Sequence, residues 1–198
     1  MDQFVLHLAS ASPRRREILN SLDVRHSFAG VNIDETARSG EKARDLVSRL
    51  AHEKACAVGK NEYLGLPILA ADTVVVVDEQ IFGKPASKEH GLAMLAALSG
   101  RAHRVLTAVT LRYAGEYDAR LSETEVRFRE LHPDEAHAYW QSGEPNGKAG
   151  AYAIQGLGGV FVESINGSYS GVVGLPVFET AALLRPAGIH VLPEPLTS

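Results

Sequence analysis

Residues 68–77 read Ile68-Leu-Ala-Ala-Asp-Thr-Val-Val-Val-Val77, and only Asp72 and Thr73 in this run are polar. A nearly continuous apolar run rich in valine is typical of a strand that is buried on both faces of a sheet. An isolated carboxylate in such a strand is costly, so Asp72 should be ion-paired, protonated or bound to a metal. Alternatively, the strand ends near Ala71 and Asp72 is solvated at its carboxyl end, where α/β folds also bind ligands. Either arrangement makes Asp72 the first candidate for function.

Strand-like and helix-like segments alternate on both sides of this run. Phe4 to Ala9 predicts a strand, and the helix that follows is expected to have Ser12 as its cap and Pro13 as its first residue. The other expected helices cover about 41–60, 87–98 and 133–143 and begin again near 176; the other expected strands cover about 104–113, 123–131 and 160–164. This alternation predicts an α/β fold with a mixed sheet. No linker or repeat interrupts it, so residues 1–198 are expected to form one domain of two closely packed lobes.

The composition excludes several classes of protein. With 45% hydrophobic and 22% charged residues, the chain is an ordinary globular protein rather than a disordered one. A net charge of -4 and the lack of a long basic stripe argue against a nucleic-acid binder. The first three residues carry no basic group, and the apolar run after them stops at Ala9, too soon for a signal peptide or a membrane span. A single cysteine, Cys56, also fits a reducing compartment, so we expect a cytoplasmic protein without membrane contact.

The turn after the first strand carries hydroxyls and guanidiniums. Residues 10–16 read Ser-Ala-Ser-Pro-Arg-Arg-Arg, and a strand-to-helix turn presents free backbone N–H groups to a bound anion. Ser10, Arg14 and Arg15 are therefore candidates for a phosphate site. The alternative is an ordinary serine cap followed by solvated arginines.

Lys54 ends the apolar stripe of the second helix, four residues after Leu50. Its ammonium either extends along the helix to the surface or meets a phosphate or Asp72 in a cleft. Glu35 and Lys84 lie in predicted loops, where a charged side chain is usually solvated. Spacing alone leaves these alternatives open.

Residues 147–159 form a glycine-dense segment that contains Gln155. Its glycines allow the backbone to approach a ligand closely, and the Gln155 amide can pair with the edge of a base. The segment could equally be a mobile loop. It lacks the spacing of a P-loop, and the histidines lack the spacing of a zinc helix, so neither of those sites is expected.

Five motifs together resemble the Maf family of nucleotide pyrophosphatases over residues 4 to 186. They are Ser10-Ala-Ser-Pro-Arg-Arg15, Ala71-Asp-Thr73, Gly83-Lys-Pro85, Lys148-Ala-Gly-Ala-Tyr152 and Ile154-Gln-Gly156. The resemblance implies a twisted mixed sheet in two lobes flanking a deep cleft, related to the inosine-triphosphate pyrophosphatases. It also implies homodimers and a hydrolase in which water attacks the α-phosphorus of a nucleoside triphosphate and pyrophosphate leaves.

The resemblance assigns a role to each candidate residue. Asp72 is the catalytic carboxylate, and with Glu35 it holds a divalent cation, which would be Mg²⁺, Mn²⁺ or Co²⁺. The triphosphate is gripped by five residues: Ser10, Arg14, Arg15, Lys54 and Lys84. These roles agree with phosphoryl chemistry, which depends on positioning and on neutralising charge.

The segment 151–156, Ala-Tyr-Ala-Ile-Gln-Gly, is similar to the branch of the family that acts on dTTP and UTP. The resemblance makes Arg14, Thr73 and Gln155 the positions that select the substrate, which could also be a modified pyrimidine nucleotide. The alternatives are the 7-methyl-GTP branch and a non-catalytic nucleotide-binding regulator of cell division. A regulator has no need of Asp72, Glu35 and Lys54 together, so their co-occurrence favours an enzyme.

Overall fold

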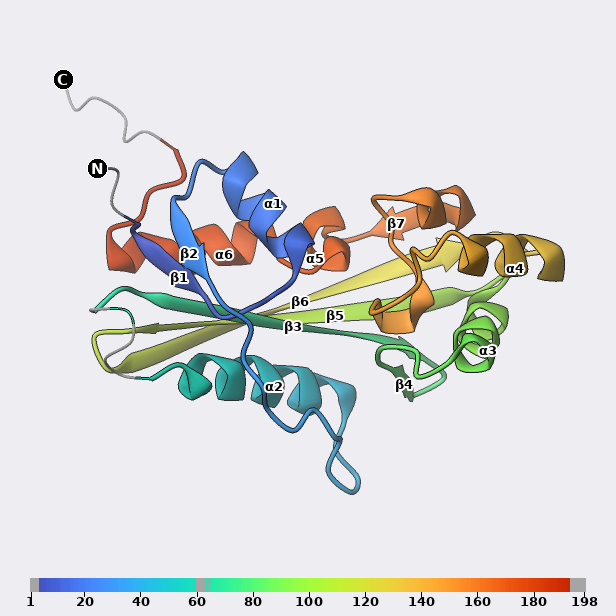
Figure 1. The fold of residues 1–198 in the computed structure, drawn as a ribbon, viewed down its shortest axis with the longest axis horizontal. Helices are drawn as coiled ribbons and strands as arrows, with labels where there is room; N and C mark the ends of the chain where they lie inside the picture. Colours follow the sequence, from blue (N-terminus) through green and yellow to red (C-terminus); the bar gives the residue numbers. More distant parts are fainter. Residues whose placement is uncertain (1–3, 60–62, 64, 193–198) are drawn as a thin grey trace.

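The computed structural model describes residues 4–59, 63 and 65–192. Within these residues a seven-stranded mixed sheet has the order β2-β1-β3-β5-β6-β7, and β4 pairs with β3 beside this path (Figure 1). The strands are β1 (Leu6–Leu8), β2 (His26–Phe28), β3 (Ile68–Val77), β4 (Gln80–Phe82), β5 (Ala102–Tyr113), β6 (Glu116–Phe128) and β7 (Val162–Asn166). Strand β1 is parallel to β2 and β3, whereas the other pairs are antiparallel. The predicted α/β fold with a mixed sheet is confirmed.

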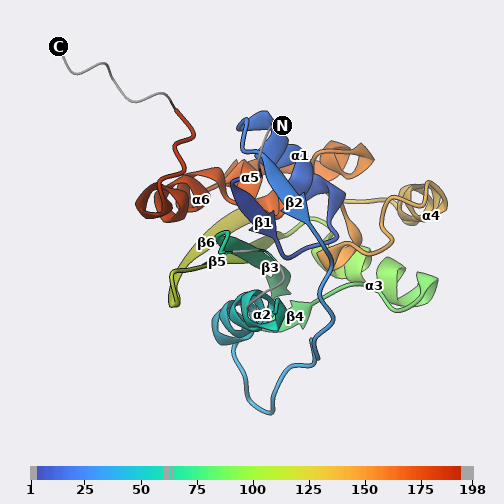
Figure 2. The ribbon, with the colours of Figure 1, turned by 60° about the vertical axis from the view of Figure 1, so that its left-hand side comes forward.

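The helices form two groups around the sheet. They are α1 (Pro13–Ser21), α2 (Ala43–Ala57), α3 (Lys88–Leu98), α4 (Pro133–Gln141), α5 (Tyr169–Val173) and α6 (Val177–Leu184), with short 3₁₀ helices η1 (Ala149–Ala151), η2 (Leu157–Phe161) and η3 (Arg185–Ala187). Helix α2 covers one face of the sheet and α1, α5 and α6 cover the other, while α3 and α4 gather at the far end of the long strands (Figures 1 and 2). None of the helices in the described part of the chain is long and apolar enough to cross a bilayer.

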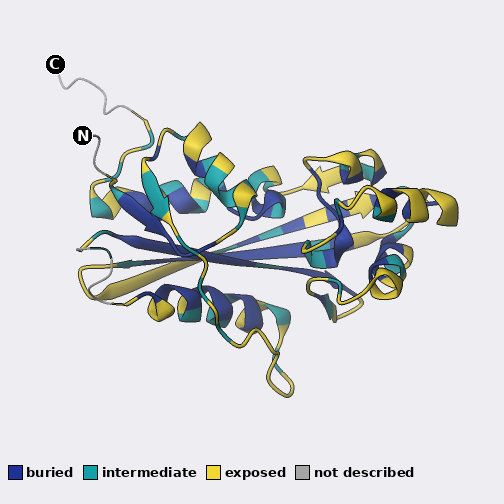
Figure 3. Ribbon diagram, in the orientation of Figure 1, coloured by how far each residue is buried: buried dark blue, intermediate teal, exposed yellow. Residues whose placement is uncertain are grey.

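Strand β3 is buried on both faces, as the apolar run predicted. Val74 and Val76 pack with Leu50 of α2, whereas Leu69 and Ala71 pack in a separate cluster with α1 and α6 on the opposite face. Strands β3 and β5 are accordingly mostly dark blue, the colour of buried residues, in Figure 3, whereas much of β6 is yellow, the colour of exposed residues. Successive side chains of a strand point to opposite faces. The polar residues at positions 72 and 73 therefore face different layers of helices.

Several boundaries differ from the sequence prediction. Strand β6 begins at Glu116 rather than Glu123, because Ala114 and Gly115 turn the chain with positive φ values of 50° and 87°. Strand β7 begins at residue 162 rather than 160, after η2. Helix α2 ends at Ala57, before the expected end at Lys60, which itself lies outside the described residues. Helix α1 begins at Pro13 as predicted.

One edge of β3 is open in its middle. Strand β1 pairs with β3 only at Ile68 and Leu69, and β4 pairs with it only from Val75 to Val77. Since β5 occupies the opposite edge, the described strands leave residues 70–74 unpaired on the β1 side. The chain after β2 crosses in front of this edge on its way to α2 (Figures 1 and 2). This gap in the sheet positions the candidate site.

Candidate active site

A cavity of about 590 Å³ lies at the open edge of β3. All nine residues predicted from the sequence line it: Ser10, Arg14, Arg15, Glu35, Lys54, Asp72, Thr73, Lys84 and Gln155. They come from six separate parts of the chain, among them the start of α1, helix α2, strand β3 and the glycine-dense segment. The fold therefore brings the predicted set together at one place.

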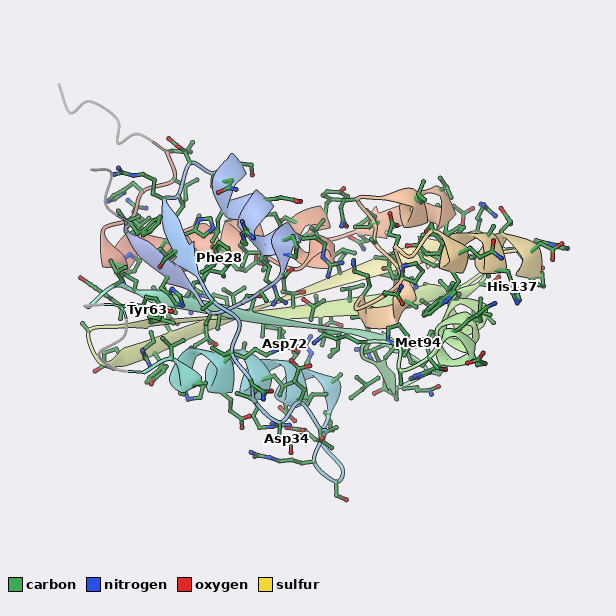
Figure 4. The ribbon with its side chains drawn as sticks, in the orientation of Figure 1. Phe28, Asp34, Tyr63, Asp72, Met94 and His137 are labelled. Atoms are coloured by element: carbon green, nitrogen blue, oxygen red, sulfur yellow. The ribbon has the colours of Figure 1, made fainter. Side chains whose placement is uncertain are left out.

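Asp72 is buried and ion-paired. Its side chain is 10% exposed, and Oδ1 lies 2.5 Å from Nζ of Lys54, whose side chain is 9% exposed. Strand β3 continues past this residue to Val77, so the alternative of a solvated carboxylate at a strand end is wrong. The Lys54 side chain likewise turns into the cavity instead of extending to the surface. Figure 4 shows Asp72 near the middle of the sheet, above α2.

Glu35 joins this pair from the crossing segment. Its Oε1 lies 2.7 Å from Nζ of Lys54, and its Oε2 accepts a hydrogen bond of 2.9 Å from Nζ of Lys84. Burial works to raise the pKa of Glu35, but the hydrogen bonds and charges of the two lysines outweigh burial and lower it to about 2. Two carboxylates and two ammonium groups thus alternate along one wall of the cavity.

Arg15 is held rigidly on the other side of β3. Its Nε donates to the Gly174 carbonyl at 2.7 Å, Nη1 to Ser10 Oγ at 3.2 Å and Nη2 to Thr73 Oγ1 at 3.3 Å. Burial lowers the pKa of Arg15, and the nearby carboxylates of Asp72 and Glu35 oppose that effect. A guanidinium stays charged in spite of such a shift. Arg15 therefore presents a fixed positive charge to the cavity.

Thr107 orients Thr73. Its Oγ1 donates to the Gly171 carbonyl at 2.8 Å and lies 2.9 Å from Thr73 Oγ1, so Thr73 supplies the hydrogen between the two hydroxyls. The lone pairs of Thr73 then accept from Arg15. Sequence reasoning did not single out Thr107, although a threonine inside the apolar run of β5 gives the same kind of signal as Asp72 in β3.

The start of α1 is open to a ligand. Ser12 is at the cap position, but its side chain makes no capping hydrogen bond, so the alternative of an ordinary serine cap is wrong. Ser10 Oγ accepts from Ser12 N at 3.2 Å as well as from Arg15, which leaves its own hydrogen free to donate. Arg16 stacks on the Phe28 ring, with its guanidinium carbon 3.6 Å from the ring centroid. Arg14 and Arg15, by contrast, line the cavity.

Gln155 closes the cavity from the glycine-dense segment. It is exposed, and its amide has no hydrogen-bond partner among the described residues. Glu144, which the sequence prediction did not include, also lines the cavity and binds the backbone after Gln155. Seen alone, a glutamate followed by proline in a polar loop gives no signal of such a role.

The fold and the site define an α/β protein with a ligand cavity that combines buried carboxylates with fixed cationic groups. The chain belongs to the Maf-like protein family, which matches residues 5–187. It is 51% identical to the dTTP/UTP pyrophosphatase of Methylococcus capsulatus, covering 93% of this chain and 91% of that protein. It is 52% identical to the dTTP/UTP pyrophosphatase of Bordetella parapertussis, with 94% of each chain covered.

Among solved structures, the chain is similar to the Staphylococcus aureus Ham1 protein, with a TM-score of 0.42 and 12% identity over 62% of this chain and 71% of that one. It is also similar to a nucleoside-triphosphatase, or dITP/XTP pyrophosphatase, from Mycobacterium abscessus. That TM-score is 0.40, at 15% identity, with 92% and 95% of the two chains covered. The family assignment rests on the sequence matches.

Proposed function

We propose that this chain hydrolyses dTTP and UTP to the nucleoside monophosphate and pyrophosphate. The relatives that carry the name dTTP/UTP pyrophosphatase support this proposal, because they are about half identical over more than nine-tenths of both chains. The observation that carries it is the buried pair of Asp72 and Lys54 in the same cavity as Arg15 and the open start of α1. The proposal includes a cytoplasmic location, where nucleoside triphosphates are abundant, and the homodimer stays a prediction.

The cationic groups of the cavity would hold the triphosphate. Arg15 has guanidinium N–H groups left after its three hydrogen bonds, and Ser10 has a free hydroxyl hydrogen. Backbone N–H groups at the start of α1 add favourable dipoles for an anion. Burial and then the charge of Arg15 lower the pKa of Arg14, so the two guanidiniums gain from a bound anion between them. Lys84, with its side chain 60% exposed, can close over the phosphates from the rim.

Asp72 would accept the proton of the attacking water. Oxygen from that water bonds to the α-phosphorus, the bond from the α-phosphorus to the bridging oxygen breaks, and pyrophosphate leaves with the bonding electrons. Lys54 holds the carboxylate on its open strand edge and, like Arg15, offsets the negative charge that develops on the phosphate oxygens. A buried carboxylate fixed by an ammonium needs little reorganisation for this step.

Asp72 and Glu35 fit a divalent cation. Both carboxylates lie within 2.7 Å of one ammonium nitrogen, so a single cationic centre already draws them together. No group of three or more His, Cys, Asp or Glu side chains that could hold a metal occurs in the described part of the chain. Mg²⁺ commonly takes only one or two carboxylates and completes its shell with phosphate oxygens and water. When bound, such a cation would neutralise phosphate charge.

Gln155 would select the base. Its amide offers one donor group and one acceptor, which together match the carbonyl and N–H edge of uracil or thymine. It faces the cavity without a partner among the described residues, so it is available to a base. Thr73 donates its hydrogen to Thr107 and accepts one hydrogen bond from Arg15, so it would offer a base its remaining lone pair and its methyl group.

A panel of nucleotides tests the proposal. The purified chain, assayed for pyrophosphate release with Mg²⁺, Mn²⁺ or Co²⁺, should hydrolyse dTTP and UTP with much higher kcat/KM than ATP, GTP, CTP or 7-methyl-GTP. A preference for 7-methyl-GTP would move the chain to the other branch of the family. Binding of nucleotide without release of pyrophosphate under any of the three cations would support a regulator.

A further inference from the structure

Tyr139 and Glu144 form a polar pair behind the glycine-dense segment. Tyr139 lies in α4 and is only 5% exposed. Its hydroxyl donates to Glu144 Oε1 at 2.7 Å and accepts from the backbone N–H of Ala153 at 3.0 Å. The pair therefore holds the chain two residues before Gln155.

Glu144 holds the same segment after Gln155. Its Oε2 accepts from the backbone N–H of Leu157 and its Oε1 from that of Gly158, each at 2.9 Å. The fit is close, because a Cβ atom at Gly156 would lie 2.1 Å from Glu144 Oε2 and one at Gly158 would lie 2.6 Å from the Tyr139 oxygen. Gln155 is thus fixed from both sides by two side chains that leave its own amide free.

The protonation states suit this arrangement. Burial, assisted by the hydrogen bond to Glu144, raises the pKa of Tyr139, so the phenol keeps its hydrogen. Burial opposes ionisation of Glu144, but the backbone N–H of Gly158 and the Tyr139 hydroxyl outweigh it and lower the pKa of Glu144. At neutral pH the tyrosine donates and the carboxylate accepts three hydrogen bonds.

We propose that Tyr139 and Glu144 are positioning residues that set base specificity by fixing the backbone that carries Gln155 at the cavity. This inference rests on the proposed function, because it concerns the base that the same cavity would select. An amide can discriminate between bases only if the backbone that carries it holds its position in the cavity. The pair supplies that restraint through the backbone on both sides of Gln155.

Two substitutions remove the restraint in different ways. Tyr139→Phe deletes both the donor to Glu144 and the acceptor for Ala153. In Glu144→Gln the shape is kept, but the new amide NH₂ must face the backbone N–H of Leu157 or Gly158, whichever way it turns. Tyr113→Phe is the matched control, because Tyr113 is partly exposed at the end of β5 and does not line the cavity.

The experiment compares these three variants with the wild-type chain. We measure kcat and KM for dTTP and CTP, the inhibition constant of inorganic tripolyphosphate, which has no base, and the thermal unfolding of each protein. Tyr139→Phe and Glu144→Gln should lower the dTTP to CTP ratio of kcat/KM by about fivefold or more, as expected when a buried polar group loses its partner. Tripolyphosphate inhibition of Tyr139→Phe should stay within about twofold of wild type, because Tyr139 lies near Arg14 but its phenol is uncharged at neutral pH, so the substitution removes no charge from the phosphate side.

Folded Tyr139→Phe and Glu144→Gln proteins that keep the wild-type ratio would overturn the inference. It would also be overturned if Tyr139→Phe weakened inhibition by tripolyphosphate by as large a factor as it lowered kcat/KM for dTTP. The pair would then support the whole cavity rather than the base site. Glu144 lies near Arg14 and raises its pKa, so its variant is judged by the ratio alone. The nucleotide preference of the wild-type chain tests the proposed substrate. The change in that preference from wild type to variant tests the role of Tyr139 and Glu144, and it can be measured with whichever nucleotide the wild-type chain prefers.

Discussion

The ammonium nitrogen of Lys54 lies 2.5 Å from Oδ1 of Asp72, and nine-tenths or more of both side chains is buried. A buried ion pair contributes little net stability, because the cost of removing both charges from water offsets their attraction. Apolar residues could join α2 to β3 equally well. The pair is therefore better explained by chemistry than by stability, and its removal should affect turnover more than folding.

Asp72→Asn should reduce kcat for dTTP by at least about a hundredfold, since the amide cannot accept the proton of the attacking water. The fold should survive because Lys54 keeps Glu35 as a partner. Asp78→Asn, which removes the exposed partner of Arg101, is the control and should leave kcat unchanged. A folded Asp72→Asn protein with near wild-type turnover would disprove the assignment of Asp72 as proton acceptor.

Arg15→Ala should lower kcat/KM for dTTP and for UTP by the same factor. Loss of charge-assisted contacts in a closed cavity costs about 2 kcal/mol, which is a loss of roughly thirtyfold in kcat/KM. Lys84→Ala should act in the same direction, and Lys88→Ala at the exposed start of α3 is the control. If Arg15→Ala changed the preference between bases while overall activity persisted, its role in holding phosphate would be wrong.

Glu35→Gln should reveal the ion pairs of Glu35 through the pH dependence of stability. The pKa of Glu35 is lowered to about 2 in the folded protein. Its contribution to the free energy of unfolding is therefore complete above the pKa that Glu35 has in the unfolded chain, and it disappears as the pH falls to about 2. The carboxylate is 42% exposed, so solvent screening limits the contribution to about 1 kcal/mol. Urea unfolding at pH 6 should show this difference in the free energy of unfolding between wild type and variant, and the difference should disappear on acidification. A difference in the free energy of unfolding that does not change with pH would exclude a contribution from the ion pairs of Glu35.

Gln155→Ala should lower the dTTP to CTP ratio of kcat/KM by about fivefold to a hundredfold, because a base then loses its matching amide. Gln141→Ala, at the exposed end of α4 and outside the cavity, is the matched control. An unchanged ratio in Gln155→Ala would move base recognition to other groups of the cavity wall.

The sequence predicted the elements with long periodic patterns and missed several of the short ones. Strand β3 was found with its bounds because ten residues carry one signal, whereas β2 and β4 have three residues each and α5 has five. The first residues of β6 were missed because they form an exposed arm of the hairpin and carry no apolar alternation. Such segments become strands through pairing with a neighbour, which no local pattern records.

Most of the cavity residues were predicted because they stood out from their surroundings or belonged to a family motif, whereas Glu35 was named only through the family resemblance. Asp72 interrupts an apolar run, and Lys54 ends an apolar stripe. The pairing of Lys54 with Asp72 was one of two open alternatives, and only the packing of α2 on β3 decides between them. Tyr139 and Glu144 were missed because their partners are backbone groups up to 14 residues away, which the side-chain sequence does not reveal.

Hydrolysis of dTTP in ¹⁸O-labelled water tests the central claim most directly. Attack at the α-phosphorus places the water oxygen on that atom, so mass spectrometry should find one ¹⁸O in dTMP and none in pyrophosphate. The Asp72→Asn protein should form neither product at an appreciable rate. Labelled pyrophosphate with unlabelled dTMP would mean attack at the β-phosphorus, and dTDP with labelled orthophosphate would mean attack at the γ-phosphorus; either result would contradict the account.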